Sequence, residues 1–203
     1  MFLGANPASS AKGPDLVPKT TPLPTLTQVE QIIRAMRYPE REMTLFALLT
    51  EMNLSEICGL QWKYVNLTGT WLNDREEPIP PLTIAVHKRW YRGELADAKD
   101  TRRRQIPIPE TLLPMLLLLK DRTRYRGPED FVLTSRSGAA INVTNITARR
   151  LGVIGKRLEM PELTWQVLRR AQSAMKQAYG PQFQYHIAAA HYRGDQAVSS
   201  PPD

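Results

Sequence analysis

The chain has 203 residues, of which 42% are hydrophobic and 23% are charged. This balance is typical of a globular protein with a packed core, and the length favours one main domain. The net charge of +7 favours a polyanionic partner, of which nucleic acid is the commonest. The single cysteine, Cys58, excludes an internal disulfide and a thiolate-rich zinc site, and we expect it to be buried.

The sequence shows no segment that would span a membrane. The longest apolar run, residues 112–119, is too short and contains Pro114. The first ten residues lack the basic start and the apolar centre of a signal peptide. We therefore expect a protein with no membrane contact, and the single cysteine favours the reducing cytoplasm as its compartment. We also expect no metal and no cofactor.

The N-terminal part predicts an arm followed by helices. Residues 1–24 are rich in proline without a helix or strand period, which indicates a flexible arm. The next segment, LTQVEQIIRAM, has one apolar face and a predicted capping box formed by Thr27 and Glu30. Two further helices are expected over residues 39–50 and 54–60.

The middle of the chain changes to a strand period. Residues 65–72, 82–91 and 102–109 contain β-branched and aromatic side chains in alternation and are separated by turn-forming segments. We expect a small three-stranded antiparallel sheet. Pro107 and Pro109 place its last strand at an edge, because proline lacks the donor that a central strand needs.

Helices return in the C-terminal half. We expect one over residues 110–125, one capped by Asn142, one running from a cap at Thr164 to Gly180, and a short one over residues 182–190. The fold class is therefore α+β and mainly α. The domain spans residues 25–192, and residues 193–203 form a flexible tail.

Four segments carry a resemblance to a known family. They are LTQVEQIIRAM, LLTEMNLSEICGLQWKYVNL, AKDTRRRQIPIPETL and LTWQVLRRAQSAM. In this order and at this spacing, they resemble the catalytic domain of tyrosine recombinases, the phage-integrase family. The resemblance covers residues 26–192 and implies a helical domain that carries a small three-stranded antiparallel sheet.

The resemblance also implies a reaction on DNA. In the family, a tyrosine attacks a DNA phosphodiester and two arginines hold the phosphate oxygens. A hairpin lysine protonates the leaving 5′ oxygen, and histidines assist proton transfer. Such fixed cations stabilise the charge that builds on the phosphate in the transition state.

Only part of this catalytic set is present. The positions that keep a family residue type are Lys99, Arg169 and His191. Four other residues stand where catalytic residues would be: Asn53 for the first arginine, Gln166 and Arg170 for the two histidines of the H-x-x-R-H motif, and Ser200 near the place of the tyrosine. Because such a set acts cooperatively, the resemblance implies a domain that no longer cleaves DNA.

Structural interpretations stand beside these catalytic ones. Asn53 and Glu56 have the spacing of a helix capping box. Lys99 is also explained as an exposed hairpin lysine, and His191 as a structural histidine. A displaced nucleophile would have to be Tyr179, Tyr185 or Tyr192; packed aromatic residues on a short helix are the simpler explanation.

Binding depends on a wider set of cations. The basic residues expected to contact DNA are Lys88, Arg89, Arg102, Arg103, Arg104, Arg149, Arg150 and Arg170. About two dozen residues precede Leu26, too few for the second domain with which family members clamp DNA. We therefore expect weak, salt-sensitive binding of double-stranded DNA.

Two alternatives remain open at this stage. The first is an active site-specific recombinase with a displaced nucleophile. The second is a protein-interaction module on the same scaffold, which would exchange its C-terminal helix with a second copy of itself or with another recombinase protomer.

Overall fold

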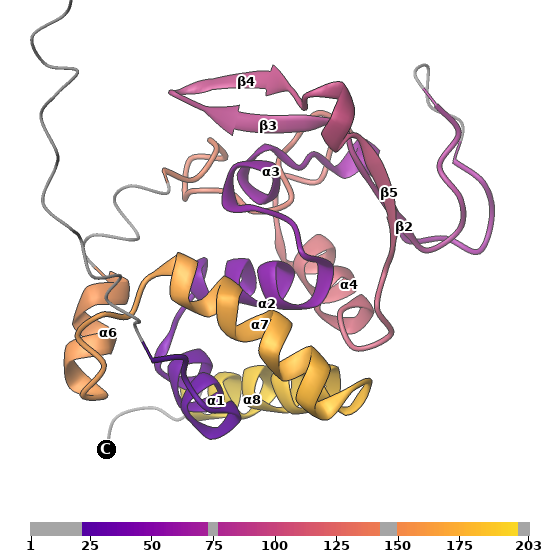
Figure 1. Ribbon diagram of the computed structural model, residues 1–203. Helices are drawn as coiled ribbons and strands as arrows, with labels where there is room; N and C mark the ends of the chain where they lie inside the picture. The colour runs from indigo at the N-terminus through magenta and orange to yellow at the C-terminus, as the bar shows by residue number, and fades with distance from the viewer. Residues whose placement is uncertain (1–21, 73–76, 143–149, 199–203) are drawn as a thin grey trace, which may run out of the picture.

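The computed structural model describes residues 22–72, 77–142 and 150–198, and its elements are mainly helices (Figure 1). The α-helices are α1 (Leu26–Ala35), α2 (Glu40–Thr50), α3 (Leu54–Gly59), α4 (Leu113–Arg122), α6 (Gly152–Arg157), α7 (Trp165–Tyr179) and α8 (Gln182–Val198). Short 3-10 helices are η2 (Trp62–Tyr64) and η3 (Asp100–Arg102). The strands are β1 (Val65–Asn66), β2 (Thr83–Val86), β3 (Lys88–Tyr91), β4 (Glu94–Asp97) and β5 (Arg104–Pro107).

The predicted fold class, mainly α with a small three-stranded antiparallel sheet, is confirmed. The sheet has the order β1-β2-β5, with Val65 opposite Ile84 and Ile84 opposite Ile106. Strand β5 lies at the edge, as the prolines predicted, and its Pro107 pairs with Thr83. The proline ring therefore removes no hydrogen bond from a central strand.

The segment expected to be one strand over residues 82–91 is divided. It breaks at His87, whose side chain is buried and whose carbonyl oxygen accepts a hydrogen bond from the Ala98 N–H at 2.8 Å. Beyond the break, β3 pairs with β4 in a separate hairpin. Its tip consists of Arg92 and Gly93, both at positive φ (52° and 85°), which is the backbone of the favoured two-residue hairpin turn.

Two helix ends also differ from the prediction. The N-cap of α1 is Thr25 rather than Thr27, because Thr25 is extended and its side chain accepts from the Gln28 N–H. Glu30 instead pairs with Arg34 at 2.8 Å. Helix α8 continues to Val198, beyond the end expected near residue 190.

Other helix ends are as predicted. The Thr164 side chain accepts a hydrogen bond from the Val167 N–H at the start of α7, and Gly180 at φ 55° ends this helix. Several predicted features lie outside the described residues: most of the arm over residues 1–24, the helix after Asn142, and the end of the tail from residue 199 onward.

The hydrophobic core joins distant parts of the chain. Helix α8 packs on α1 and α2, and buries Phe183, Ile187 and Ala190 there. Helix α7 contacts α2 and α8, so its position relative to the sheet is set by the helical half of the domain. Figure 1 shows the strands on one side of the molecule and α1 and α8 on the other.

Helix α3 connects the two halves by a close approach to β3. A Cβ atom on Gly59 would lie 2.6 Å from backbone atoms of Arg89, so only glycine allows this contact. The neighbouring Cys58 is fully buried, as expected, and burial raises the pKa of its thiol to about 12. Within the described ranges, no helix is long and apolar enough to cross a membrane.

Candidate functional site

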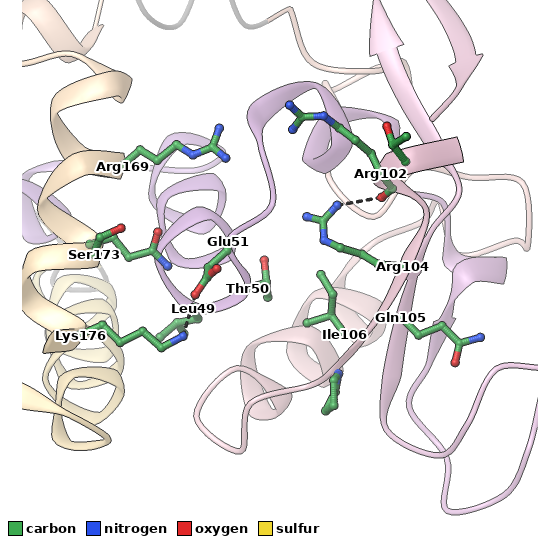
Figure 2. A pocket seen from close by; sticks show the side chains of 13 residues that line it. Leu49, Thr50, Glu51, Arg102, Arg104, Gln105, Ile106, Arg169, Ser173 and Lys176 are labelled. Carbon is green, nitrogen blue, oxygen red and sulfur yellow. Dashed lines mark hydrogen bonds and ion pairs between the residues drawn. The ribbon is translucent and has the colours of Figure 1, made fainter. Parts of the chain in front are cut away.

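An open cleft of about 760 Å³ lies between α7 and β5. Figure 2 shows Arg169, Ser173 and Lys176 on α7 at one side of this cleft and Arg102 and Arg104 at the other. The end of α2 supplies the residues between these two sides. The lining residues are polar for the most part and include four cationic side chains, which makes the cleft suited to an anion.

Two of the four cations are already paired with carboxylates. Lys176 Nζ lies 2.6 Å from Glu51 Oε1. The guanidinium of Arg104 binds both carboxylate oxygens of Glu56, at 2.9 and 3.3 Å. Glu56 is only 2% exposed, so the acidic side of this ion pair lies out of contact with solvent.

The other two cations are available. Arg102 and Arg169 are exposed, and their side chains make no hydrogen bond or ion pair with any described residue. They face the cleft from opposite sides (Figure 2). An arginine guanidinium presents several donors in one plane, so each of these two side chains can bind phosphate oxygens.

Asn53 performs the capping role that its spacing with Glu56 predicted. Its Oδ1 accepts hydrogen bonds from the Glu56 N–H at 3.0 Å and from the Ser55 hydroxyl at 2.7 Å. In return, Glu56 Oε2 accepts from the Asn53 N–H at 3.1 Å. The Asn53 side-chain oxygen is therefore occupied by the start of α3.

A conformational feature of the preceding turn is linked to the same cleft. Glu51 occupies the left-handed region, with φ 59° and ψ 13°, at the end of α2. Glycine is the residue that adopts this conformation without a steric penalty. Here the glutamate side chain instead places a carboxylate beside Lys176.

The structure brings three of the family positions together. Asn53 at the start of α3, and Gln166 and Arg169 at the start of α7, line one cavity of about 350 Å³. Residues more than a hundred positions apart in the sequence therefore lie around one cavity. Two of the three, however, are uncharged amides.

Other predicted site residues lie elsewhere. Lys99 is exposed at the start of η3 and does not line the cleft. His191 is buried, with its Nε2 3.4 Å from Glu42 Oε1, and lines a different cavity beside α4. Arg170 is exposed beside Arg169 but is not among the lining residues.

Two predicted positions are not described. Arg149 and Ser200 lie in the ranges 143–149 and 199–203, outside the described residues.

Several of the cations expected to bind DNA are held by acidic groups. Lys88 Nζ lies 2.5 Å from Asp97 Oδ1, and this hydrogen bond together with the lysine charge lowers the pKa of Asp97. Arg89 donates to the Asp97 carbonyl at 3.2 Å. Arg103 lies 3.9 Å from the Asp97 carboxylate, and Arg150 lies 2.9 Å from the buried Glu40. The ion pairs of Lys88, Arg103 and Arg150 reduce the positive potential that the sequence alone indicates.

The candidate displaced nucleophiles lie away from the cleft. Tyr179, Tyr185 and Tyr192 are exposed at 45%, 48% and 38%, and none of them lines the cleft. The ring of Tyr179 packs against that of His186, with 6.4 Å between centroids. Among the described residues, no group of three His, Cys, Asp or Glu side chains could hold a metal ion.

Sequence reasoning missed the cleft residues Ser173 and Lys176. Both share a helix face with Arg169, since they follow it by four and seven residues on α7. That spacing was a usable signal, because a helix places residues so separated on one side.

The fold defined by these elements is that of tyrosine-recombinase catalytic domains. One solved structure with this fold is the integrase of transposon Tn1549 in complex with a circular intermediate DNA, at a TM-score of 0.61 and 15% identity. The match covers 93% of this chain and 64% of that chain. The same integrase in complex with transposon right end DNA matches at a TM-score of 0.60 and 14% identity, with 93% and 64% covered.

A second protein with the fold is the XerA recombinase. Its crystal structure matches at a TM-score of 0.53 and 16% identity, and the match covers 94% of this chain and 68% of that chain. This chain thus spans less than two thirds of the integrase structure. No protein-family model and no curated protein sequence matches the chain.

Proposed function

We propose that this chain is a DNA-binding domain of the kind used in DNA integration and recombination, and that it does not cleave DNA. The observation that carries the proposal concerns Arg102 and Arg169, which lie on opposite sides of an open cationic cleft and have no side-chain partner among the described residues. Support comes from the fold, because the Tn1549 integrase with the same fold was solved in complex with DNA.

The charges of the cleft favour weak binding. Phosphate contacts supply most non-specific affinity for DNA, and each one contributes about 0.9 to the slope of log K against log salt. Arg102 and Arg169 have no acidic partner in the described ranges and can make such contacts, whereas Arg104 and Lys176 share their charge with Glu56 and Glu51. We therefore expect a slope of roughly −2 to −4, which corresponds to two to four phosphates.

The absence of cleavage is supported by the residues around Arg169. The first arginine position holds Asn53, whose side chain caps α3. Gln166 replaces a histidine in the same cavity, and the described tyrosines of α7 and α8 lie outside the cleft. Loss of a single transition-state donor lowers a rate by about a hundred- to a thousandfold, and losses within a cooperative set exceed this.

The test combines binding and cleavage on one preparation. A fluorescent duplex is titrated by anisotropy between 25 and about 200 mM salt, where counterion release dominates the affinity. Substituting Arg169→Ala or Arg102→Ala should weaken binding several-fold. The matched control is Arg157→Ala, which removes an exposed arginine from the end of α6 and should leave binding unchanged.

Cleavage is tested with a nicked suicide substrate, on which a tyrosine nucleophile would leave a covalent adduct. We expect none. An adduct would reject the non-cleaving proposal and favour a displaced nucleophile, which Tyr179→Phe, Tyr185→Phe and Tyr192→Phe would then identify. If the wild-type chain does not bind the duplex even at the lowest salt, the DNA-binding proposal is rejected.

A further inference from the structure

A second set of arginines lies on the segment that follows α4. Arg122, Arg124 and Arg126 are exposed, and they alternate with the half-buried residues Thr123, Tyr125 and Gly127. Arg136, from a turn that contacts Tyr125, is also exposed. We call these four residues, Arg122, Arg124, Arg126 and Arg136, the arginine row.

The arginine row is carried by a firmly held backbone. The Tyr125 carbonyl accepts a hydrogen bond from Trp62 Nε1 at 3.1 Å, and the Tyr125 N–H donates to the Thr123 hydroxyl at 3.0 Å. The Tyr125 hydroxyl donates to the Arg136 carbonyl at 3.3 Å. Its ring packs so closely on Gly138 that a Cβ there would lie 2.5 Å from it. Binding to this segment therefore orders side chains but little backbone.

The charges of the arginine row are available. None of its four side chains makes a hydrogen bond or ion pair with a residue that the structure describes. Two of the nearby carboxylates have partners of their own, since Glu129 pairs with Lys63 at 2.9 Å and Asp130 accepts from the Gly127 N–H at 2.8 Å. Residues 120–136 contain five basic and three acidic residues, which leaves a net positive surface.

The number of arginines in the row favours a phosphate backbone over an isolated anion. The four side chains lie on the segment after α4 and on a neighbouring turn, which the hydrogen bond from the Tyr125 hydroxyl to the Arg136 carbonyl joins. Several cations on one ordered stretch can each contact a different phosphate of one nucleic-acid strand.

The arginine row is separate from the cleft. None of its members is among the residues that line the cleft between α7 and β5. Arg122 borders the cavity that contains His191, and Arg126 borders one beside Trp62. The arginine row and the cleft therefore consist of different residues.

We propose that the arginine row is a second nucleic-acid surface, which binds a phosphate backbone independently of the cleft. One chain then holds two DNA segments at once. This goes beyond the proposed function, because the row uses different residues and binds whether or not the cleft does.

The test uses three versions of the full chain: the wild type, a row variant (Arg122→Ala, Arg124→Ala and Arg126→Ala) and a cleft variant (Arg102→Ala and Arg169→Ala). Biotinylated duplex on beads is mixed with each protein and then with a fluorescent second duplex. In parallel, binding of one labelled duplex is followed by anisotropy. Circular dichroism verifies that each variant is folded. We expect folding to be retained, because the replaced side chains are exposed.

We expect the wild type to capture the second duplex. The row variant should still bind a single duplex through the cleft. The amount of second duplex that it captures should fall at least about tenfold, because three phosphate contacts are removed. The cleft variant should retain binding that disappears when the row substitutions are added.

The remaining results of the capture and anisotropy experiments distinguish failure of the arginine row from failure of the cleft. If the row variant captures the second duplex as well as the wild type does, oligomers joined by their clefts explain capture and the second surface is rejected. It is also rejected if the cleft variant binds no DNA. If the cleft variant binds like the wild type and the row variant does not bind, the row stands and the cleft proposal fails. No binding by the wild type rejects both.

Discussion

Replacement of Arg104 by alanine should destabilise the domain through the carboxylate that it leaves behind. Arg104 donates two hydrogen bonds to Glu56, at 2.9 and 3.3 Å, and Glu56 is 2% exposed. After Arg104→Ala, the backbone N–H of Asn53 would be the remaining donor to this carboxylate among the described residues. A buried charge that loses its partner is unfavourable, because water cannot replace the lost interactions.

The size of the effect follows from burial on both sides of the pair. Breaking a fully buried ion pair costs about 3–5 kcal/mol. The Arg104 side chain is 35% exposed, so solvent already screens part of the interaction. We therefore expect about 2–3 kcal/mol of lost stability, which for a domain of this size lowers Tm by roughly 5–10 °C.

The measurement is thermal and urea unfolding followed by circular dichroism. Arg102→Ala is the matched control, because it removes the same charge from an exposed side chain without a described partner and should change stability by less than about 0.5 kcal/mol. Glu56→Gln in the Arg104→Ala background should restore part of the loss. The reasoning is refuted if Arg104→Ala and Arg102→Ala unfold alike.

Three further outcomes are expected. Glu51→Gly should stabilise the folded state by about 1 kcal/mol, since glycine adopts φ 59° without strain and the exposed pair with Lys176 contributes little; an unchanged or lower Tm would contradict this. Cys58, with a pKa of about 12, should react with a thiol reagent at pH 8 only after denaturation, and rapid labelling of the native protein would show that the thiol is accessible. Lys88→Ala should raise the pKa of Asp97 towards its ordinary value in an NMR titration. Because the pKa of Asp97 is lowered in the folded state, the Lys88 interaction stabilises the protein at neutral pH and is lost as the pH falls through that pKa. Lys88→Ala should therefore make the stability less sensitive to acid. If the pKa of Asp97 does not change in this variant, Lys88 is not the cause of the shift.

Local features of the fold were predictable from the sequence. The capping box of Asn53 and Glu56 depends on residues three apart, so the pattern contains all of its determinants. Thr25 and Thr27 show the limit of such patterns. Both threonines precede a suitable partner by three residues, and the extended backbone at Thr25 decides which one caps α1. The sequence pattern therefore allows either threonine to cap α1 and does not indicate which of them does.

Features set by tertiary contacts were harder to predict. The apolar alternation runs through His87 without interruption, yet the strand breaks there because the buried ring packs on Tyr64 and the carbonyl bonds to Ala98. Helix α8 continues past residue 190 into a polar segment of low helix preference, after a stretch that is buried on α1 and α2. Neither the break at His87 nor the end of α8 is determined by residues close to it in the sequence.

The candidate site likewise combines features that were predictable from local sequence with features that depend on distant residues. Arg169 could be named as a candidate site residue from the sequence, because it stands at the arginine of the H-x-x-R-H motif. The ion pairs that neutralise other cations join distant residues, as Arg150 joins Glu40 over 110 positions and Lys176 joins Glu51 over 125. A count of basic residues therefore overestimates the surface that is available to DNA.

The packing of α8 on α1 has a consequence for the order of events during synthesis. Helix α1 is the first described helix to leave the ribosome, and its buried residues Val29, Ile32 and Ile33 face a partner made about 150 residues later. At about 5 to 20 residues per second, this apolar face waits roughly 8 to 30 s for α8. A nascent chain in that interval has its longest-range contact still unmade, so slow translation of the last two helices would favour aggregation over folding.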